Sequence, residues 1–335
     1  MSVRFLQVDA FSAAPFGGNP AAVVMMPAGA SDDGLMQRIA AENNLAETAF
    51  VIPLSADASD AVGRGSRFGL RWFTPKCEVD LCGHATLATA AALFTACHNT
   101  SPALTFATRS GDLIARRWAD RAGGAPDGVW MDFPANPPVE LELGAAFAEY
   151  GAMIRIALSG LLDEVGEGAG VESLVARVAH STATRKLIVL LKQSGSECLA
   201  KLGPDTAALQ ATHDGSSVRG IAITTEGVDA SENDFYSRYF APWNGIPEDA
   251  VTGSLHTVLA PFWAATFEAR AGADAAPRTA LVGRQCSPRG GTLHLRLDAA
   301  RPVTKATHRI QIGGEFLLFT VTFYANRAHS LTRSP

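Results

Sequence analysis

Two stretches of the chain share one design: residues 78–94, EVDLCGHATLATAAALF, and residues 248–263, EDAVTGSLHTVLAPFW. Each has acidic residues, then a glycine followed by a small or polar residue, then an apolar segment long enough for a helix. Gly83 and Gly253 lie about half the chain apart, which predicts two similar halves. A helix N-terminus exposes unpaired N–H groups and the positive end of the helix dipole. Two such ends facing one cleft would bind a small carboxylate or another anion.

The apolar segments also predict the architecture. A helix that is apolar on all sides is normally buried, and the first segment offers little polar surface, with Leu87, Ala90, Leu93 and Phe94 along it. Many short strand-like pieces accompany each helix. We therefore expect an α+β fold in which each half is a sheet curled around its own central helix.

Hydrophobic periodicity and turn residues predict the individual elements. The first half predicts a helix capped by Ser31 that ends near residue 43, a helix over 83–96, and strands over 3–11, 21–26, 48–52, 68–73, 104–107, 112–118 and 129–133. The second half predicts helices over 204–211 and 253–267, and strands over 187–191, 218–225, 235–240, 281–286, 292–297 and 310–324. Residues 144–184 are rich in Ala and Gly and give no clear pattern.

Length and composition bound the class of protein. A chain of 335 residues exceeds the usual size of a single core, and the three prolines of residues 134–138 predict the connector between an N-terminal domain, 1–134, and a C-terminal domain, 135–317. With 47% hydrophobic residues the chain can fill a substantial core. The net charge of −5 comes without a Lys/Arg block, so nucleic acid is not an expected partner.

The sequence also bounds the compartment. It has no apolar run that approaches the roughly 20 residues of a membrane span, and its first residues alternate like a strand, without the apolar core of a signal peptide. We expect a cytoplasmic protein that does not interact with membranes. Five widely spread cysteines are too few for a disulfide framework, which predicts free thiols.

Glu47 is the first candidate for chemistry. It stands where a helix ends and an apolar strand begins, between Leu45 and Phe50. Partial desolvation there would suit its carboxyl group to proton transfer near neutral pH. The alternative is an ordinary surface or capping glutamate, as most acidic residues are.

His84 follows Gly83 in the first turn of the first central helix. The positive helix end disfavours an added proton, so we expect a neutral imidazole that bonds a substrate or relays a proton. A capping or packed histidine is the alternative.

The second repeat offers Asp249, Thr252 and Ser254 around Gly253. A Thr-Gly-Ser turn entering a helix presents N–H groups and hydroxyls to an anion. Asp249 would orient a base or contact a substrate amine or hydroxyl. The alternative is N-capping by Thr252 or Ser254, which requires no ligand.

The cysteines near the first repeat suggest two other chemistries. Cys77, Cys82 and His84 form a C-x4-C-x-H pattern, which lacks the usual spacing of a zinc site. A thiol such as Cys82 beside a helix N-terminus has a lowered pKa, which allows a nucleophilic role. A symmetric two-thiol racemase is disfavoured because Thr252 occupies the equivalent position.

Common cofactor motifs are absent from the sequence. It contains no Gly-x-Gly-x-x-Gly after a strand, no Walker A sequence, no Gly-x-Ser-x-Gly and no His-Glu-x-x-His. We therefore predict no nucleotide, flavin or metal.

These residues stand in motifs that resemble the phenazine-biosynthesis PhzF-like family, whose fold is that of diaminopimelate epimerase. The matching pieces run in order along nearly the whole chain: VDAF at 8–11, GNP at 18–20, NLAETAF at 44–50, RWFTP at 71–75, EVDLCGHAT at 78–86, SRYFAPW at 237–243, GIPEDAVTGS at 245–254 and RGG at 289–291. One departure is Ala250, where the family usually has a proline that would fix the turn holding Asp249.

The resemblance implies two pseudo-symmetric domains, each a β-barrel-like sheet around a central helix, with the active site between them. It implies that the final strand, at about residues 318–330, returns to the first domain, and that the protein is a homodimer. In the family, the glutamate that matches Glu47 moves a proton on a small cyclic amino-hydroxy acid without a cofactor. Gly83, His84, Asp249 and Ser254 match the family's site, and Asn19 belongs to its Gly-Asn-Pro piece.

The preferred hypothesis is therefore a cofactor-independent isomerase. A carboxylate-bearing substrate would lie between Gly83 and Gly253. Glu47 would donate or remove a carbon-bound proton, and His84 and Asp249 would position the substrate or relay the proton. The main alternative is a binding or interaction protein that keeps the scaffold with weak or lost catalysis. A thiol racemase that uses Cys82 alone is a third possibility.

Overall fold

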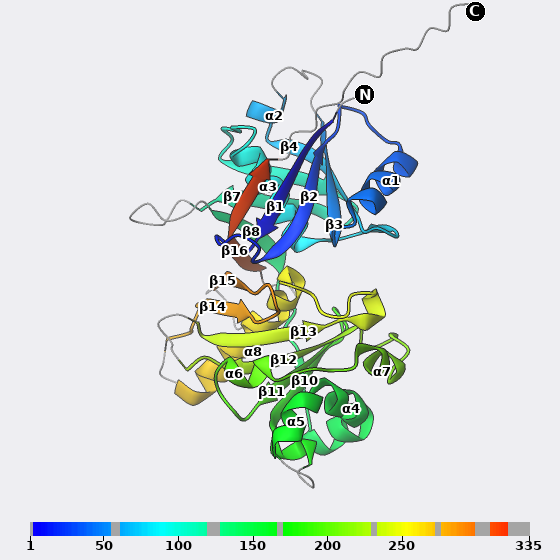
Figure 1. Ribbon diagram of the computed structural model, residues 1–335. Coiled ribbons are helices and arrows are strands. Elements are labelled where there is room, and N and C mark those ends of the chain that lie inside the picture. The colour runs from blue at the N-terminus through cyan, green and yellow to red at the C-terminus, as the bar shows by residue number, and fades with distance from the viewer. Residues whose placement is uncertain are drawn as a thin grey trace, which may run out of the picture.

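The structure is a computed structural model that describes residues 3–54, 61–118, 128–165, 170–228, 233–271, 276–298 and 309–320. The chain forms two lobes stacked on each other, with the N-terminal half in one and most of the C-terminal half in the other (Figure 1). No helix in these ranges is both long enough and apolar enough to cross a membrane.

The first lobe is built from the first half of the chain. Its elements are β1 (Arg4–Ala10), β2 (Asn19–Met25), α1 (Asp33–Asn43), β3 (Glu47–Pro53), α2 (Ala61–Arg64), β4 (Arg67–Phe73), β5 (Glu78–Val79), α3 (Gly83–Phe94), β6 (Ala103–Thr108), β7 (Gly111–Arg117) and β8 (Gly128–Pro134).

The second lobe contains most of the later elements. They are β9 (Val139–Leu141), α4 (Leu143–Ala157), α5 (Ser159–Val165), the short 3₁₀ helix η1 (Val171–Ser173), β10 (Val175–Ser181), β11 (Lys186–Leu191), α6 (Glu197–Ala200), α7 (Thr206–Ala211), β12 (Gly220–Glu226), β13 (Phe235–Phe240), η2 (Pro242–Asn244), α8 (Gly253–Ala271), β14 (Ala280–Gln285), β15 (Gly291–Leu297) and β16 (Arg309–Thr320).

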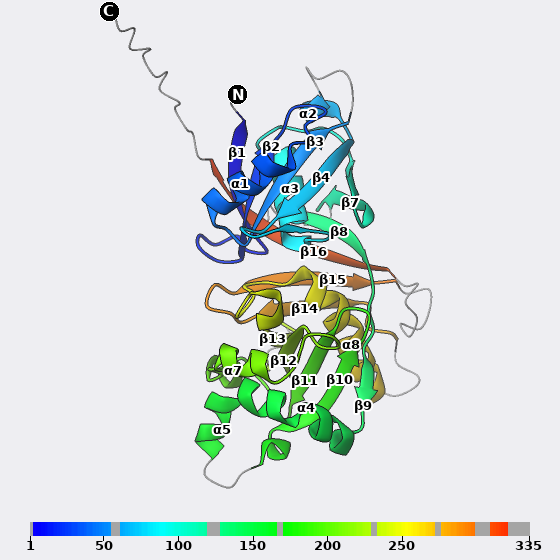
Figure 2. The ribbon, with the colours of Figure 1, turned by 90° about the vertical axis from the view of Figure 1, so that its right-hand side faces the viewer.

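The sheet of the first lobe closes into a barrel. Its strands follow the order β1-β2-β3-β4-β6-β7-β8-β16, and β16 pairs with β1 to close the ring. The helix α3 runs through this lobe (Figure 2), and every one of its residues is buried. Its many alanines allow the strands to come close. The expected sheet around a central helix is thus confirmed for this half.

The sheet of the second lobe continues from the first without a break. From β16 it runs through β15, β14, β13, β12, β11 and β10 to β9. One face packs on α8, where Leu255, Val258 and Leu259 join the same core cluster as α3. The opposite face packs on α4 in a second cluster. Within the described ranges this sheet curls around α8 and leaves β9 as an edge.

The strand β16 belongs to both lobes. Residues 310–313 pair with β15, residues 309–315 with β8, and residues 316–320 with β1. The described strand ends at Thr320, so most of the predicted returning segment, 318–330, lies outside the described residues. The division into domains 1–134 and 135–317 stays a prediction.

The proline-rich connector crosses between the lobes over α8. Pro261 inside α8 has no N–H group, so the carbonyl one turn earlier, on Thr257, loses its helical partner. The backbone N–H of Asn136 donates to that carbonyl at 2.9 Å, and the Asn136 side chain binds the Thr257 hydroxyl. The connector is therefore docked on the second central helix.

Two details differ from the sequence-based expectations. Asp32 rather than Ser31 caps α1, because the Asp32 carboxylate accepts a hydrogen bond from the N–H of Leu35. The stretch without a clear pattern, 144–184, contains most of α4, with α5 and β10 after it.

Candidate active site

Two helix N-termini face each other where the lobes meet. The helix α3 begins at Gly83 and α8 begins at Gly253. A methyl group on Gly83 would lie 3.6 Å from the Cα atom of Gly253, and one on Gly253 would lie 3.7 Å from the Cα atom of Gly83. The lack of side chains lets the two turns approach, so the positive ends of two dipoles meet at one place.

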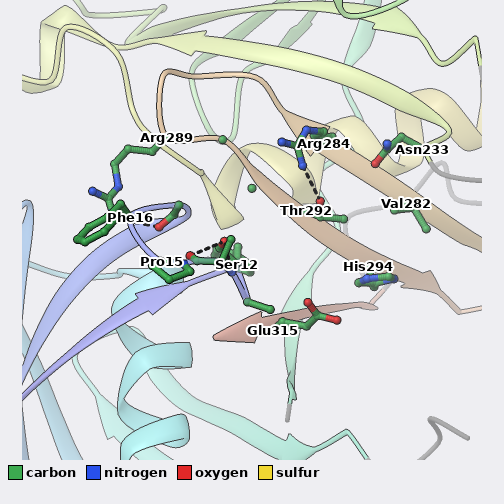
Figure 3. Close-up of a pocket in the computed structure, with 16 residues that line it drawn as sticks. Ser12, Pro15, Phe16, Asn233, Val282, Arg284, Arg289, Thr292, His294 and Glu315 are labelled. Carbon is green, nitrogen blue, oxygen red and sulfur yellow. Dashed lines mark hydrogen bonds between the residues drawn. The ribbon is translucent and has the colours of Figure 1, made fainter. Parts of the chain in front are cut away.

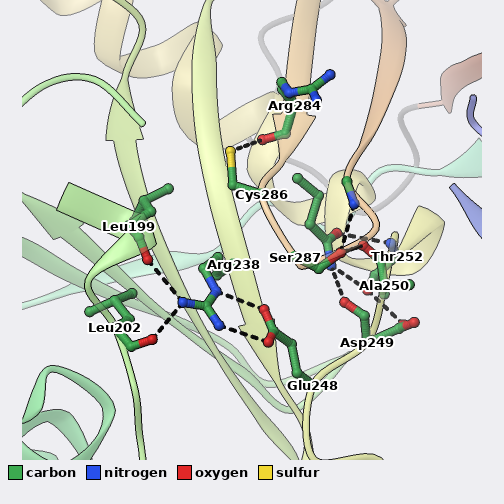
Figure 4. Close-up of polar contacts among 12 residues, drawn as sticks. Leu199, Leu202, Arg238, Glu248, Asp249, Ala250, Thr252, Arg284, Cys286 and Ser287 are labelled. Atoms are coloured by element: carbon green, nitrogen blue, oxygen red, sulfur yellow. Dashed lines mark hydrogen bonds and ion pairs between the residues drawn. The ribbon is translucent and has the colours of Figure 1, made fainter. Parts of the chain in front are cut away.

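An arginine holds the glutamate that precedes each glycine turn. Arg71 on β4 binds both carboxylate oxygens of Glu78 at 2.7 Å. Arg238 on β13 binds both oxygens of Glu248 at 2.7 and 2.8 Å (Figure 4). Glu78 and Glu248 stand at the same position relative to their glycines. Sequence reasoning missed these two pairs, although each arginine opens an Arg-x-Phe-x-Pro piece shortly before its repeat.

Glu47 and His84 form a close pair beside the first turn. Glu47 begins β3 and is 8% exposed, and His84 is 6% exposed. The Oε2 atom of Glu47 lies 3.1 Å from the Nε2 atom of His84. Among the described residues, neither atom has a well-aligned hydrogen-bond partner. Both atoms are therefore available to form a hydrogen bond with a bound molecule.

The expected neutral state of His84 is wrong. Burial alone would lower the pKa of the imidazole, but the neighbouring Cys82 and Glu47 side chains outweigh burial and raise this pKa well above 6.5. A carboxylate 3.1 Å away acts more strongly than the diffuse field of a helix end. The surroundings of His84 therefore favour its charged form.

Cys82 lies beside His84 but does not have the properties of an activated thiol. Its Sγ atom is 3.4 Å from the Nδ1 atom of His84. Burial, followed by the charge of Glu47, raises the pKa of the thiol, which corrects the expected lowering by the helix end. Cys77 is exposed and lies outside this group. Glu47, Cys82 and His84 have ligand atoms within 4.8 Å of one another, so these three residues could hold a metal ion.

Asp249 lies on the other side of the site and is held by residues from both lobes. The Asn19 side-chain amide donates to its Oδ1 atom at 2.8 Å, and the Thr252 hydroxyl donates to Oδ2 at 2.6 Å. Burial raises the pKa of Asp249, while the charge of His84 and these hydrogen bonds oppose the rise. Asn19 is itself buried, and its amide also binds the carbonyl of Val251.

The turn around Asp249 is well fixed despite Ala250. The Gln285 amide donates to the Asp249 carbonyl at 2.6 Å and its oxygen accepts from the N–H of Thr252 at 2.9 Å. The Ser287 hydroxyl donates to the Ala250 carbonyl at 2.6 Å (Figure 4). These contacts replace the rigidity that a proline would supply. Gln285 and Ser287 were missed from sequence, although they lie four and two residues before the RGG motif.

Thr252 and Ser254 flank Gly253 as predicted from the motif. The Thr252 hydroxyl donates to Asp249, and its oxygen accepts from the Gln285 amide at 3.3 Å. Ser254 is partly exposed in the first turn of α8. The structure thus brings Glu47, His84 and the Gly83 turn together with the Asp249–Ser254 turn.

Two buried polar side chains of the second lobe were missed from sequence. His256 has its Nδ1 atom 2.8 Å from the Thr252 carbonyl, and burial lowers its pKa to about 4, so it is neutral. Its Nε2 atom has no partner among the described residues. The second is Lys186, at the start of β11. The place of His256 in the first turn of the second repeated helix could have marked it as a candidate. No feature of the sequence marked Lys186.

A separate surface cavity of about 640 Å³ lies between the β1–β2 loop and strands β14 and β15 (Figure 3). Arg284, Arg289 and Glu315 line it, and none of the predicted site residues does. Phe11 also lines it, and its ring would lie 3.7 Å from a methyl group on Gly253. The candidate active site is the group of residues around the two turns rather than this open cavity.

Comparison with known proteins identifies the family. A family model described as phenazine biosynthesis-like protein matches residues 8–320. A mouse protein, phenazine biosynthesis-like domain-containing protein 1, is 41% identical over 301 residues, which are 89% of this chain and 92% of that protein. A protein of Pseudomonas aeruginosa named as an uncharacterised isomerase is 38% identical over 94% of this chain and 98% of its own.

Solved structures agree in fold. A phenazine biosynthesis PhzF family protein of Enterococcus faecalis has a TM-score of 0.72 and 33% identity, over 95% of this chain and 97% of that chain. A probable proline racemase of Agrobacterium radiobacter, at 12% identity, has a TM-score of 0.53 over 96% of this chain and 94% of that chain, which shows a shared fold alone. The chain therefore belongs to the family of phenazine biosynthesis-like proteins and is an isomerase.

Proposed function

We propose that this isomerase moves a carbon-bound proton on a small amino or hydroxy acid, with Glu47 as the general acid and base. The observation that supports this most directly is the Glu47 carboxylate, which is buried and 3.1 Å from the His84 imidazole beside the meeting helix ends. A carboxylate in such a place is suited to take a proton from carbon and to return it as a carboxylic acid.

The substrate carboxylate would bind between the Gly83 and Gly253 turns. The N–H groups and dipoles of α3 and α8 supply fixed positive charge there without a metal or cofactor. When Glu47 removes the proton, its bonding electrons stay on the substrate, and the same dipoles stabilise the negative charge that develops. Glu47 then returns that proton to a different carbon, which completes an isomerisation with no net change in atoms.

His84 and Asp249 would have supporting roles. The charged imidazole of His84 would hold the Glu47 carboxylate in place and stabilise negative charge on the substrate. Asp249 would accept a hydrogen bond from a substrate amine or hydroxyl, because Asn19 and Thr252 leave each of its oxygens a further acceptor position. Asn19, Thr252 and Ser254 complete the substrate-binding set.

Isotope exchange in heavy water tests the proposal. We expect the protein, incubated with a panel of small amino-hydroxy acids, to incorporate deuterium at carbon in at least one of them. Glu47→Gln keeps the size of the side chain but removes the proton carrier. The rate of deuterium exchange in this variant should be at least about 100-fold lower, while folding and ligand binding are retained.

Glu42→Gln is the matched control, because Glu42 is an exposed glutamate on α1 near the same strand. It should exchange at the rate of the unmodified protein. Full exchange in the Glu47 variant would show that another group carries the proton. Binding without exchange in the unmodified protein would favour a binding protein on the same scaffold.

A further inference from the structure

Lys186 places an ammonium group inside the second lobe. The residue is 7% exposed. Among the described residues its Nζ atom has one oxygen acceptor, the Thr184 carbonyl at 3.5 Å, and lies 5.9 Å from the centre of the Tyr239 ring. Both contacts are at the limit of their interaction ranges. A buried charge with so little compensation is costly, and proteins keep one mainly where a partner binds it.

Strand geometry gives the direction of this side chain. Successive side chains of a strand point to opposite faces. Ile188 and Leu190 belong to the core cluster around α8, whereas Leu187 and Val189 belong to the cluster around α4. Lys186 shares the face of Ile188 and Leu190. It therefore points toward the central helix of the second lobe.

The strand topology shows which end of α8 lies near Lys186. Asn19 opens β2, which runs antiparallel to β1 and parallel to β3. Lys186 opens β11, which runs antiparallel to β10 and parallel to β12. Lys186 pairs with Gly220 at the start of β12, as Ala21 pairs with Glu47 at the start of β3. Asn19 lies two residues before Ala21, on the same face of β2, and reaches the site by binding Asp249. Lys186 therefore lies near the end of its strand that faces the site.

Contacts around Tyr239 lead to the same place. The carbonyl of Tyr239 accepts a hydrogen bond from the N–H of Asp249 at 3.1 Å, and the Tyr239 ring lies beside Lys186. The charge of Asp249 is close enough to act on the ammonium. The Asp249 carboxylate is, however, already bonded by Asn19 and Thr252, and no direct ion pair with Lys186 is formed among the described residues.

We propose that Lys186 binds a second acidic group of the substrate, so that the substrate is a small dicarboxylic acid. One carboxylate would lie between the Gly83 and Gly253 turns, and the other would accept hydrogen bonds from the Lys186 ammonium. This inference rests on the proposed function for the position of the first carboxylate. An ammonium offers three donors, which matches a carboxylate that arrives with its own charge.

Ligand binding tests the role of Lys186 without requiring turnover. The probes are malonate, succinate and glutarate, each compared with the monocarboxylate in which hydrogen replaces one of its carboxylate groups: acetate for malonate, propionate for succinate, butyrate for glutarate. Calorimetric titration of the full chain should show that at least one diacid binds at least about tenfold more tightly than its monoacid. Lys186→Met should remove this preference and leave monoacid binding unchanged.

Two controls separate the possible explanations. Lys192→Met removes an exposed lysine that directly follows the far end of the same strand, and it should keep the preference. Glu47→Gln should also keep it, so a failed proton transfer and a failed diacid site are distinguished. The proposal would be overturned if the unmodified protein bound no diacid more tightly than its monoacid. It would also be overturned if the Lys186 variant kept the preference for the diacid, or lost affinity for diacid and monoacid equally.

Discussion

The charge of Lys186 reduces the stability of the folded protein, and its pH dependence can be predicted. Burial lowers the pKa of the ammonium from 10.5 to about 8, against the opposing effect of Asp249. The folded state therefore binds this proton less tightly than the unfolded chain. The contribution of Lys186 to the free energy of unfolding is unfavourable below pH 8 and is relieved as the pH rises to 10.5.

Lys186→Met should consequently stabilise the protein at neutral pH by at most about 3 kcal/mol. The gain should shrink as the pH rises through the window between 8 and 10.5 and be absent above it. Urea unfolding at neutral pH and above the ordinary lysine pKa measures both values. Lys192→Met, at an exposed position, should show no such gain. A Lys186 variant less stable than the unmodified protein at neutral pH would contradict the prediction.

Single residues show where sequence reasoning reaches its limit. Glu47 and His84 were predicted from local context, since one begins an apolar strand and the other begins an apolar helix. The charge of His84 was not predictable, because it depends on a carboxylate brought from another element. Lys186 was missed because a lysine at a strand end is usually solvated, and only the fold shows that this one points inward.

At the scale of elements, the meeting of α3 and α8 predicts the effect of adding a methyl group. Neither glycine has a left-handed backbone, so alanine fits the local conformation. Its methyl group would stand in the space between the turns. Gly83→Ala and Gly253→Ala should each lower the affinity for a carboxylate probe by at least about tenfold, while the free energy of unfolding changes by less than about 1 kcal/mol.

Gly151→Ala is the control for helix propensity. Gly151 lies inside α4, and a methyl group there would meet only the Phe147 side chain at 3.9 Å. This change should stabilise the protein by about 0.5–1 kcal/mol and leave carboxylate binding unaffected. Isothermal titration and urea unfolding of the three variants give the comparison. Unchanged binding in both turn variants would show that the anion binds elsewhere.

Elements with a uniform or strongly alternating pattern were predictable from the sequence. The buried helix α3 is apolar all round, and β13 has the predicted bounds. The helix α4 was not recognised, although its buried residues recur at helical spacing. Those residues are Ala146, Tyr150, Met153, Ile154 and Ala157. Small alanine side chains weaken the contrast between its faces, so composition concealed the period.

At the scale of the whole molecule, β16 predicts how strongly the two lobes depend on each other. Residues 316–320 complete the first barrel by pairing with β1, while the start of the same strand belongs to the second sheet. A chain that ends at Glu315 should lose at least about 3 kcal/mol of unfolding free energy, since each lost backbone hydrogen bond is worth about 1 kcal/mol.

A chain that ends at Thr320 is the matched control, because it keeps the whole of β16. Urea unfolding, followed by tryptophan fluorescence, should show one weakened transition for the shorter chain and a normal transition for the control. Equal stability of the two chains would mean that closure of the barrel contributes little.

The overall arrangement was only partly accessible from sequence. Two similar halves followed from the repeated glycine-helix pattern, and the resemblance supplied the expectation that the last strand returns. The continuous sheet from β1 to β9 was not foreseen, because pairing between distant strands leaves no local signal. The expected homodimer and the cytoplasmic location stay predictions.

The hydrogen bond from Asn19 to Asp249 has a consequence for the origin of such a chain. Each half provides one helix end, and neither provides a complete site. A half-length ancestor would have needed two copies of itself to bind an anion in this way, with identical groups on both sides. Fusion of the copies would have released them from that identity. In the present chain the halves do differ there, since β3 begins with Glu47 and its counterpart β12 begins with Gly220.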